Sequence, residues 1–405
     1  MNWVRIERKK RINRKDDTFP LRRTPMTQLI FLPGFYGTRL VRKASGRLVW
    51  ISARQAVFGS QTAARTGFGV SGAQELVPGT VLDRVPVIPG LYALDVYRDF
   101  LDDLQTRVHL LGYDWREDYF EAVKKLAGLV HDLKAGGASS IILIAHSLGG
   151  VVASYYLRYG DQEPEAARET WAGVQSLDAV VMATAPFQGS MTAFRNMKHG
   201  AKFGLNTSLI SPHAFSTFTT GYTMLPVYRP VLLDHRLRPL PHTFFEPGLW
   251  QRYAWGLLST AGTVSADLTA KRLAFISRSL RRGKLLYERL HQPLSHPPER
   301  PLRLLYAFAR SHATLSRAVL LERDAHSPTR VIFERREFET YLPGQRYGAL
   351  CSDGDQTLTT ESAQLPPAFK QALHVEEHAS QAIHSQIFND RQIRDKIRAF
   401  LRAER

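Results

Sequence analysis

Cysteine is nearly absent from this sequence, which has 405 residues and a single thiol, Cys351. One cysteine cannot form a disulfide within the chain, and this excludes the disulfide-stapled scaffolds of small secreted domains. Because thiols stay reduced in the cytoplasm, we expect a cytoplasmic protein, and we leave open a peripheral contact with the inner face of the membrane.

Long apolar runs are absent as well. No run approaches the roughly 18 residues that a transmembrane helix needs. Residues 1–25 are basic and polar, without the apolar stretch of a signal peptide. We interpret them as a basic, flexible N-terminal extension ahead of the folded part of the chain.

Signatures of metal and nucleic-acid binding are also missing. The sequence contains no His-Glu-x-x-His segment or similar ligand spacing, so we expect neither a metal ion nor an organic cofactor. It lacks zinc-ligand spacing and the aromatic motif of ribonucleoprotein domains, so no nucleic-acid partner is expected. The oligomeric state is not decided by any pattern in the sequence.

Acidic residues are too few to balance the basic ones. The chain has 54 Lys and Arg against 37 Asp and Glu, for a net charge of +17, and much of the excess lies in residues 1–23 and 271–303. Such an excess fits nucleic acid, an anionic lipid surface or simple solubility. Without a nucleic-acid motif, we favour contact with an anionic membrane surface, and a merely solvated excess stays open.

The most informative stretch of the sequence is residues 141–157. Its first four residues are all apolar, which is typical of a strand buried on both faces. A turn with Ser147 at its tip follows, and residues 151–157 continue as an apolar helix. Strand, tight turn and helix around a serine form a nucleophile elbow, which needs small residues two positions before and after the serine. Ala145 and Gly149 meet that need.

Strands and helices alternate along much of the remaining chain. Four further segments predict strands: residues 27–32, 108–111, 177–185 and 302–309. Residues 117–133 carry apolar side chains at helical spacing, and residues 391–402 predict a final amphipathic helix. This alternation predicts an α/β fold with a mostly parallel central sheet flanked by helices.

Residues 191–300 interrupt the alternation, and we interpret them as a cap or lid inserted into the sheet domain. The core would then consist of residues 26–190 and 301–405. The cap is rich in aromatic residues, which form either an acyl pocket or plain core: Phe215, Phe218, Tyr222, Tyr228, Phe244, Phe245, Trp250, Tyr253 and Trp255. Residues 268–290 predict a basic helix that lies on a membrane or faces solvent. Beyond the cap, residues 329–341 predict the strands of a hairpin.

The first predicted strand ends in Pro33-Gly34, which fits the oxyanion loop of a hydrolase. Gly34 lets the backbone come close to a substrate carbonyl group. The N–H of Phe35 (or Tyr36) would be one oxyanion donor, and the N–H of Leu148, directly after the serine, would be the other. Gly34 and Gly149 would support this arrangement.

A serine hydroxyl needs a neighbouring base, and the base needs an orienting acid. In elbow enzymes these residues follow in the order serine, acid, histidine. For the acid we prefer Asp355 to Asp353, whose side chain would instead hold the loop. The base is His384, which precedes the last helix, or His378.

Two further histidines have less prominent expected roles. We expect His374 to lie on the surface. His146 is next to the serine, but its side chain would point elsewhere on the turn, so we expect it to pack in the elbow.

Several blocks of sequence together resemble lecithin:cholesterol acyltransferase-like proteins. The blocks occur in the order Pro-Gly-Phe-Tyr-Gly at 33–37, Tyr-Asp-Trp-Arg at 113–116, Ala-His-Ser-Leu-Gly-Gly at 145–150, Ala-Pro-Phe-Gln-Gly-Ser at 185–190, Gly-Tyr-Thr-Met-Leu-Pro at 221–226 and Asp-Gly-Asp-Gln-Thr-Leu at 353–358. These proteins are α/β-hydrolases that include phospholipid:diacylglycerol acyltransferases and lysosomal phospholipases. The resemblance implies an α/β-hydrolase fold, a triad of Ser147, Asp355 and His384, and oxyanion donors at Phe35 and Leu148.

The chain also departs from the family pattern. Secreted members carry disulfides, and this chain has none. Ala145 replaces a glycine, and Gln356 and Leu358 replace the commoner glycine and valine of the acid loop. The cap does not align with the family, so the substrate specificity does not transfer.

These patterns predict a serine-dependent acyl hydrolase or O-acyltransferase that acts on lipid esters through an acyl-enzyme on Ser147. A phospholipid or an acylglycerol would be the substrate. Two alternatives stay open: a carboxylesterase or thioesterase for smaller soluble esters, and a non-catalytic binding protein on a hydrolase scaffold. The sequence does not decide between water and an alcohol as the acyl acceptor.

Overall fold

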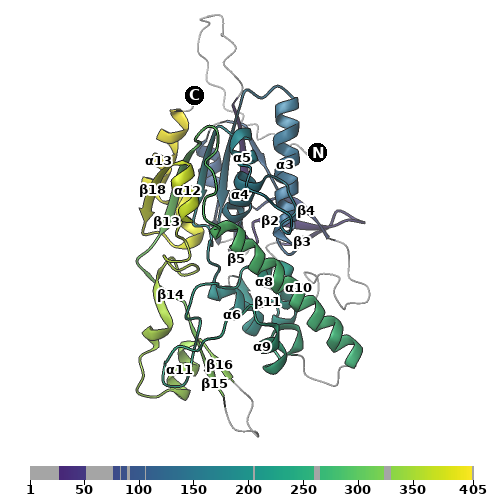
Figure 1. Cartoon of the computed structure of the whole chain (residues 1–405), viewed down its shortest axis with the longest axis vertical. Coiled ribbons are helices and arrows are strands. Elements are labelled where there is room, and N and C mark those ends of the chain that lie inside the picture. Colours follow the sequence, from purple (N-terminus) through teal and green to yellow (C-terminus); the bar gives the residue numbers. More distant parts are fainter. Residues whose placement is uncertain are drawn as a thin grey trace, which may run out of the picture.

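A six-stranded parallel sheet forms the centre of the fold (Figure 1). The computed structural model describes residues 27–51, 76–82, 84–88, 92–104, 106–203, 206–259, 265–322 and 330–403. The sheet strands run in the order β18 (His374–Ser380), β13 (Arg303–Ala309), β9 (Ala179–Ala183), β8 (Ser140–His146), β1 (Thr27–Leu32) and β7 (Val108–Leu110). Every pair of neighbours is parallel, which confirms the predicted sheet. The predicted N-terminal extension, residues 1–25, lies outside the described residues.

Helices cover both faces of this sheet. Alternate residues of each central strand point to opposite sides, and because they are apolar on both sides, each face packs against helices. One face packs against α3 (Tyr119–Ala135) and α4 (Leu148–Tyr159) and includes Ile30 and Leu143. The other face packs against α2 (Arg98–Asp103) and α13 (Arg391–Arg402) and includes Phe31 and Ile144. Strands buried on both faces explain the continuous apolar runs in the sequence.

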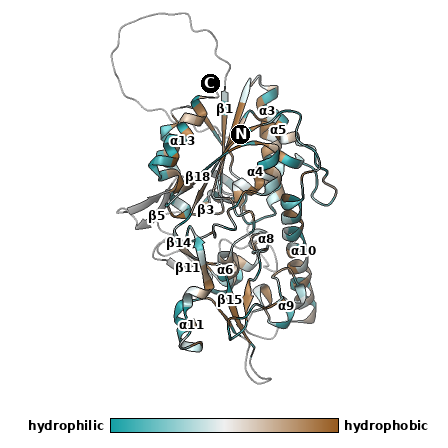
Figure 2. Ribbon diagram, turned by 60° about the vertical axis from the view of Figure 1, so that its left-hand side comes forward, coloured by the Kyte–Doolittle hydropathy of each residue, from teal (hydrophilic) through white to brown (hydrophobic). Residues whose placement is uncertain are grey.

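The predicted helices begin and end close to where the sequence places them. In α3, the Asp118 side chain accepts a hydrogen bond from the N–H of Phe120 and caps the helix. In α13, the Asp390 side chain caps the first turn, and the apolar residues Ile393, Ile397, Phe400 and Leu401 are buried. Figure 2 shows the mixed hydrophilic and hydrophobic composition of α13. No described helix is both long and apolar enough to cross a membrane.

The prediction of a hairpin over residues 329–341 is wrong in its second half. Residues 330–332 form strand β16 (Arg330–Ile332), but this strand pairs with the earlier β15 (Ala318–Leu321). Residues 335–341 form the helix α11 (Arg335–Tyr341). Its charged residues stand at helical spacing, with Arg335 and Glu339 one turn apart, and Phe338 alone is fully buried. The mixture of charged and aromatic residues there imitates the alternation of a strand.

A second layer of helices and short strands lies beyond one end of the sheet, in the lower half of Figure 1. Its helices are α6 (Met191–His199), α7 (Pro212–Ser216), α8 (Thr219–Thr223), α9 (Pro247–Arg252) and α10 (Ala266–His291). Strand β12 (Leu232–Leu233) of this layer pairs with β15, beyond residue 300. The layer therefore draws on residues from both sides of the predicted cap boundary at residue 300, and the domain limits stay a prediction.

The remaining elements are short and connect these layers. They are β2 (Thr38–Arg42), β3 (Leu48–Trp50), β4 (Leu76–Val81), β5 (Arg84–Ile88), β6 (Tyr92–Asp95), α5 (Ala172–Ser176), β10 (Ala201–Phe203), β11 (Asn206–Ile210), β14 (His312–Leu315), β17 (Cys351–Gly354), α12 (Pro367–Ala372) and the 3-10 helices η2 (Gly256–Leu258), η3 (Tyr347–Leu350) and η4 (His384–Asn389). Strand β14 pairs antiparallel with β17, which leads into the predicted acid loop.

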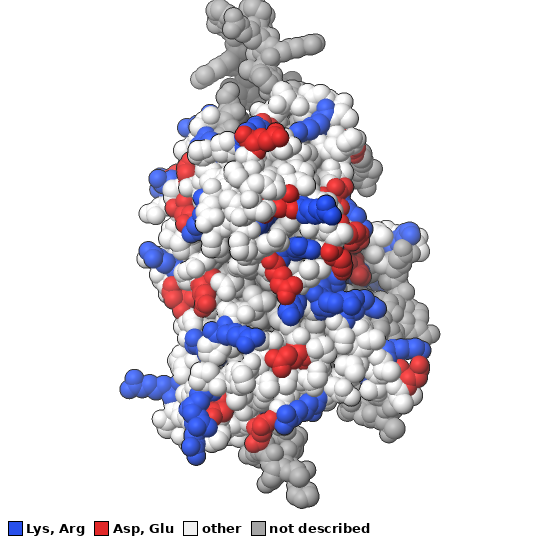
Figure 3. All heavy atoms as spheres, in the orientation of Figure 1, with Lys and Arg blue, Asp and Glu red and all other residues white. Residues whose placement is uncertain are grey.

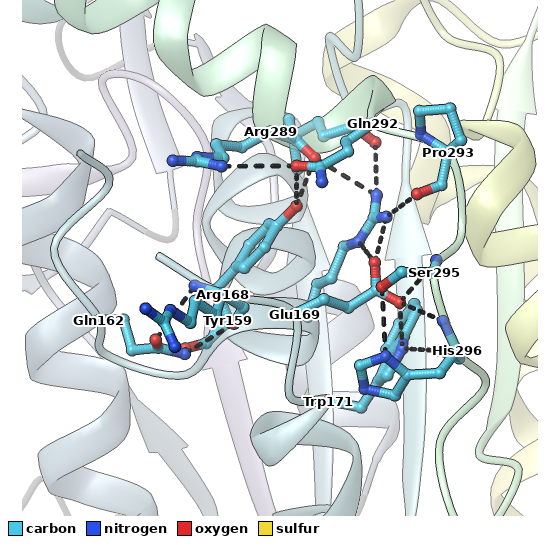
Figure 4. Close-up of polar contacts among 12 residues, drawn as sticks. Tyr159, Gln162, Arg168, Glu169, Trp171, Arg289, Gln292, Pro293, Ser295 and His296 are labelled. Carbon is cyan, nitrogen blue, oxygen red and sulfur yellow. Dashed lines mark hydrogen bonds and ion pairs between the residues drawn. The ribbon is translucent and has the colours of Figure 1, made fainter. Parts of the chain in front are cut away.

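A buried ion pair ties the end of α10 to the sheet domain. The Arg158 guanidinium, at the end of α4, donates to the Glu169 carboxylate over 3.0 Å and to the Pro293 carbonyl over 2.8 Å. Both side chains of the ion pair are almost fully buried, with 0% and 3% exposure. Figure 4 shows Glu169 facing the chain after α10, where its second oxygen accepts from the N–H groups of Ser295 and His296.

Replacing Glu169 by glutamine is expected to lower the free energy of unfolding by about 3–5 kcal/mol, because Arg158 then stays buried without a countercharge. Chemical denaturation measures this change. Glu288→Gln is a matched control, because Glu288 is exposed and, among the described residues, pairs with Lys284 alone, over 3.7 Å. That variant should stay within about 0.5–1 kcal/mol of the wild type. Equal losses in the two variants would contradict the special role of the buried pair.

Candidate active site

Ser147 lies at the tip of the turn between β8 and α4, as the elbow pattern predicts. Its φ of 51° and ψ of −121° are outside the ordinary regions for a non-glycine residue. The turn is tight, since a Cβ atom at Gly149 would lie 2.5 Å from the Leu32 carbonyl oxygen. Strand, turn and helix thus expose the Ser147 hydroxyl group at the carboxyl end of the central strand.

His384 and Asp355 complete a continuous hydrogen-bonded chain with this serine. The Nε2 atom of His384 lies 2.9 Å from the Ser147 Oγ atom, and its Nδ1 atom lies 2.8 Å from the Asp355 Oδ2 atom. The backbone N–H of His384 also donates to the Asp355 carbonyl over 3.0 Å. The three residues come from three distant segments of the chain, and the structure brings together the preferred candidates.

The Asp355 carboxylate is buried and well supplied with donors. Its Oδ1 atom accepts from the N–H groups of Thr357 and Leu358 over 2.9 and 2.7 Å. Burial raises the pKa of Asp355, but the His384 ring and these N–H donors outweigh it, and the net pKa is lowered. Asp355 therefore stays a carboxylate that can orient His384.

The rival acid lies elsewhere and holds the loop. The Asp353 side chain accepts from the N–H of Ser311 and from the Thr360 hydroxyl, each over 2.7 Å. The rival base, His378, lies on β18 beside Ala307 of β13 and is not among the residues around Ser147. His374 begins the same strand and is exposed, as expected.

The predicted oxyanion donors lie on two sides of Ser147. Gly34, directly before Phe35, approaches the serine so closely that a Cβ atom there would lie 2.9 Å from the Ser147 Cβ atom. Within the described part of the chain, the N–H groups of Phe35 and Leu148 donate to no other group. Both N–H groups are thus available to a ligand oxygen near Ser147.

The Tyr-Asp-Trp-Arg block at residues 113–116 has a structural role, because two of its side chains hold the loop at residues 33–38. The Tyr113 hydroxyl donates to the Pro33 carbonyl over 2.9 Å, and the Trp115 indole N–H donates to the Thr38 carbonyl over 2.9 Å. Both side chains are buried. The block therefore fixes both ends of the loop that carries Phe35.

A cavity of about 1000 Å³ opens beside the serine and the histidine. Its aromatic lining consists of Phe35, Tyr36, Trp50, Tyr97 and Phe215. Of the cap aromatics predicted as acyl pocket or core, only Phe215 lines this cavity. Phe244, Trp250 and Trp255 instead pack around Phe194 in the core.

Sequence reasoning missed a second part of the cavity lining. Helix α6 contributes Thr192, Arg195, Asn196 and His199 to the lining, at helical spacing i, i+3, i+4 and i+7. Arg195 forms no ion pair within the described residues. A polar stripe beside the buried apolar residues of the same helix was the available signal.

His146 packs in the elbow, as expected, and is 4% exposed. Burial is the main cause that lowers the pKa of His146 to about 3, with a further contribution from His384. In the unfolded chain a histidine has a pKa of about 6.5, so between these values the unfolded state binds the extra proton. This histidine therefore lowers the stability of the fold as the pH falls from about 6.5 to about 3.

Replacing His146 by glutamine removes this proton uptake, so acid should destabilise the variant less steeply than the wild type. The difference in free energy of unfolding between the two should shift by up to about 1.4 kcal/mol per pH unit below pH 6. Urea denaturation at pH 7, 6, 5 and 4 measures it. A difference that does not change with pH would contradict a buried neutral histidine.

Comparisons with known proteins identify the family that part of the chain resembles. Residues 105–253 match the family model described as lecithin:cholesterol acyltransferase, which confirms the resemblance over that segment. The segment holds the Tyr-Asp-Trp-Arg block and Ser147, whereas Asp355 and His384 lie outside it. A comparison with curated protein sequences finds no match.

Among solved structures, the chain is similar to one chain of the crystal structure of the Tle4–Tli4 complex, with a TM-score of 0.53 and 14% identity over 92% of this chain and 97% of that chain. It also matches the mature lipase BlEst2 of Bacillus licheniformis, with a TM-score of 0.35 and 10% identity over 96% of each chain. At such identities the likeness concerns the fold alone. The parallel sheet and the serine elbow are those of an α/β-hydrolase.

Proposed function

We propose that this α/β-hydrolase is a serine-dependent lipid acyl hydrolase or O-acyltransferase, which works through an acyl-enzyme on Ser147. The observation that carries the proposal is the hydrogen-bonded chain from Ser147 through His384 to Asp355, at the wall of a large cavity. The match of residues 105–253 to an acyltransferase family supports an acyl-ester reaction.

The geometry assigns a role to each of these side chains. The Ser147 oxygen attacks the ester carbonyl carbon while the Nε2 atom of His384 takes the serine proton. The Asp355 carboxylate accepts from Nδ1–H and stabilises the imidazolium that forms. The N–H groups of Phe35 and Leu148 stabilise the negative oxygen, each worth about 3–4 kcal/mol in comparable enzymes.

Collapse of this intermediate releases the alcohol, which receives the proton from His384, and leaves the acyl group on Ser147. In the second half, His384 removes a proton from water or from an acceptor alcohol, whose oxygen attacks the acyl carbon. Ser147 then leaves with the proton returned by His384. Water yields a free acid, and an alcohol yields a new ester.

The two walls of the cavity favour a phospholipid as the ester. The aromatic wall, with Phe35, Trp50 and Phe215, suits an acyl chain, because apolar surface is removed from water there. The α6 wall instead presents Arg195, which has no ion-paired countercharge within the described residues; Glu334 also lines the cavity, but no ion pair joins it to Arg195. A phosphate group would supply that countercharge, and guanidinium groups bind phosphate with two parallel hydrogen bonds.

Replacing Arg195 by glutamine should therefore raise the KM for an anionic phospholipid by about 10-fold, equivalent to about 1.4 kcal/mol. The kcat for a short neutral ester should change by less than about twofold, because Arg195 does not contact the triad. Kinetics on mixed micelles of constant composition measure both values. Lys198→Gln is the matched control, since Lys198 is exposed on the same helix and outside the cavity lining. Equal KM values for Arg195→Gln and wild type would contradict the proposed contact between Arg195 and the phosphate group.

The decisive test of the proposed function is product analysis by mass spectrometry. Purified protein is incubated with phosphatidylglycerol vesicles that contain a diacylglycerol and a long-chain alcohol, and Ser147→Ala runs beside it. Free fatty acid alone indicates a phospholipase, whereas triacylglycerol or wax ester indicates a transferase. If neither product depends on Ser147, the lipid proposal is wrong, and a short soluble ester is the next substrate to test.

Membrane contact and a cytoplasmic location stay predictions. Within the basic helix α10, Arg282 pairs with Asp118 and Glu165 over 2.7 and 2.8 Å, which fastens α10 to the sheet domain. On the face shown in Figure 3, basic and acidic side chains are interspersed. Any basic docking surface therefore has to involve another face, or residues outside the described part of the chain.

A further inference from the structure

The Tyr97 hydroxyl is buried between the oxyanion loop and the serine elbow. Its oxygen accepts from the N–H of Gly34 over 3.1 Å, and it lies 2.7 Å from the Nδ1 atom of His146. Tyr97 is 2% exposed, so water does not compete for these contacts. The tyrosine thus joins two segments that both border Ser147.

The second ring nitrogen of His146 extends this connection. Its Nε2 atom lies 3.2 Å from the backbone carbonyl oxygen of His384. A carbonyl oxygen can only accept, so the Nε2 atom carries the proton and the Nδ1 atom accepts from the Tyr97 hydroxyl. Gly34, Tyr97, His146 and His384 form one directed chain of hydrogen bonds.

Aromatic rings pack beside this chain of hydrogen bonds. The Tyr97 ring packs edge-on against Phe31, with 4.8 Å between ring centres, and the His146 ring lies 5.5 Å from the ring of Phe388. The rings of His146 and His384 are 5.1 Å apart. Tyr97 and His146 border the cavity, but their polar atoms are engaged with Gly34, with each other and with the His384 carbonyl, so the chain acts through the residues it holds.

We propose that Tyr97 and His146 are positioning residues, which hold the oxyanion loop and the backbone of His384 in register with Ser147. Gly34 precedes Phe35, so the contact with Tyr97 orients the peptide that carries the first oxyanion donor. The contact of His146 with the His384 carbonyl places the imidazole that accepts the serine proton. Displacements of about 1 Å in such groups cost about 100-fold in rate. This inference rests on the proposed function of Ser147.

The first experiment measures the rate at which a fluorophosphonate labels Ser147, followed by intact-protein mass spectrometry. This probe needs an activated serine and an oxyanion site but no knowledge of the natural ester. Tyr97→Phe keeps the ring and removes the hydroxyl, and we expect labelling about 10- to 100-fold slower than in the wild type. Tyr155→Phe is the matched control, because it removes a hydroxyl that donates to Gln162 over 2.8 Å, away from the cavity.

The outcomes separate the two proposals. If the wild type is not labelled at all, the proposed function of Ser147 fails. If the wild type is labelled and Tyr97→Phe is labelled within twofold of its rate, the positioning role is overturned while the function stands. Melting temperatures of both tyrosine variants exclude a general loss of folding as the cause.

Substitutions of His146 test its two hydrogen bonds, to Tyr97 and to the His384 carbonyl, separately. Asparagine places an acceptor near the Nδ1 position and keeps the contact with Tyr97, whereas glutamine reaches the Nε2 position and keeps the contact with His384. Leucine fills the space and keeps neither. We expect the labelling rate to fall in the order wild type, then His146→Asn and His146→Gln, then His146→Leu. If the leucine variant is labelled as fast as the two amide variants, His146 serves only packing.

Discussion

Replacing Ser147 by alanine is expected to lower kcat for ester hydrolysis by about 10⁴- to 10⁶-fold, the range found when serine hydrolases lose their nucleophile. Without the hydroxyl no acyl-enzyme can form, although the cavity and the two N–H donors remain. A chromogenic ester measures kcat, and the fluorophosphonate should leave the variant unlabelled. A small residual rate above that of water fits the remaining oxyanion donors.

Ser154→Ala is the control for this experiment. Ser154 is a buried serine on the same helix, and its hydroxyl donates to the Gly150 carbonyl over 2.8 Å without lining the cavity. Its loss should affect kcat by less than about twofold. If Ser147→Ala keeps more than a tenth of the wild-type rate, a different nucleophile or a non-catalytic scaffold has to be considered.

Replacing Asp355 by asparagine should lower kcat by about 10⁴-fold with the fold intact, by analogy with other triad acids. The carboxylate accepts from two backbone N–H groups through its Oδ1 atom and from His384 through its Oδ2 atom. To keep the backbone donors satisfied, the asparagine must turn its NH₂ group toward His384. The Nδ1 atom then accepts, the Nε2 atom carries the proton, and His384 can no longer take the proton of Ser147.

Asp353→Asn is the matched control, because it makes the same replacement of a carboxylate by an amide in the same loop. Asp353 holds the N–H of Ser311 and the Thr360 hydroxyl, and it does not contact His384. We expect this variant to lose stability, by about 1 kcal/mol, while kcat changes less than threefold. A larger loss of kcat in Asp353→Asn than in Asp355→Asn would reverse the assignment of the acid.

Local features were predictable from the sequence because their causes lie within a few neighbouring residues. The elbow needs a buried strand, small residues and a helix in one short stretch, and all of these stand in residues 141–157. The parallel sheet followed from apolar strands separated by amphipathic helices. Residues 335–341 were assigned wrongly because Phe338 is the one buried residue of this helix, so the apolar periodicity that predicts a helix is weak there.

By itself, the sequence determined the nucleophile elbow, the parallel sheet and the order of serine, acid and histidine. Only the tertiary structure decided which acid and which histidine meet Ser147, because they come from separate segments whose positions depend on the register of β18 and the path of the acid loop. It alone showed that the polar stripe of α6 lines the cavity beside Ser147 and that Tyr97 contacts His146, since segments distant in sequence leave no joint pattern. Periodicity reports the buried face of an element, and only packing brings particular side chains from different elements together.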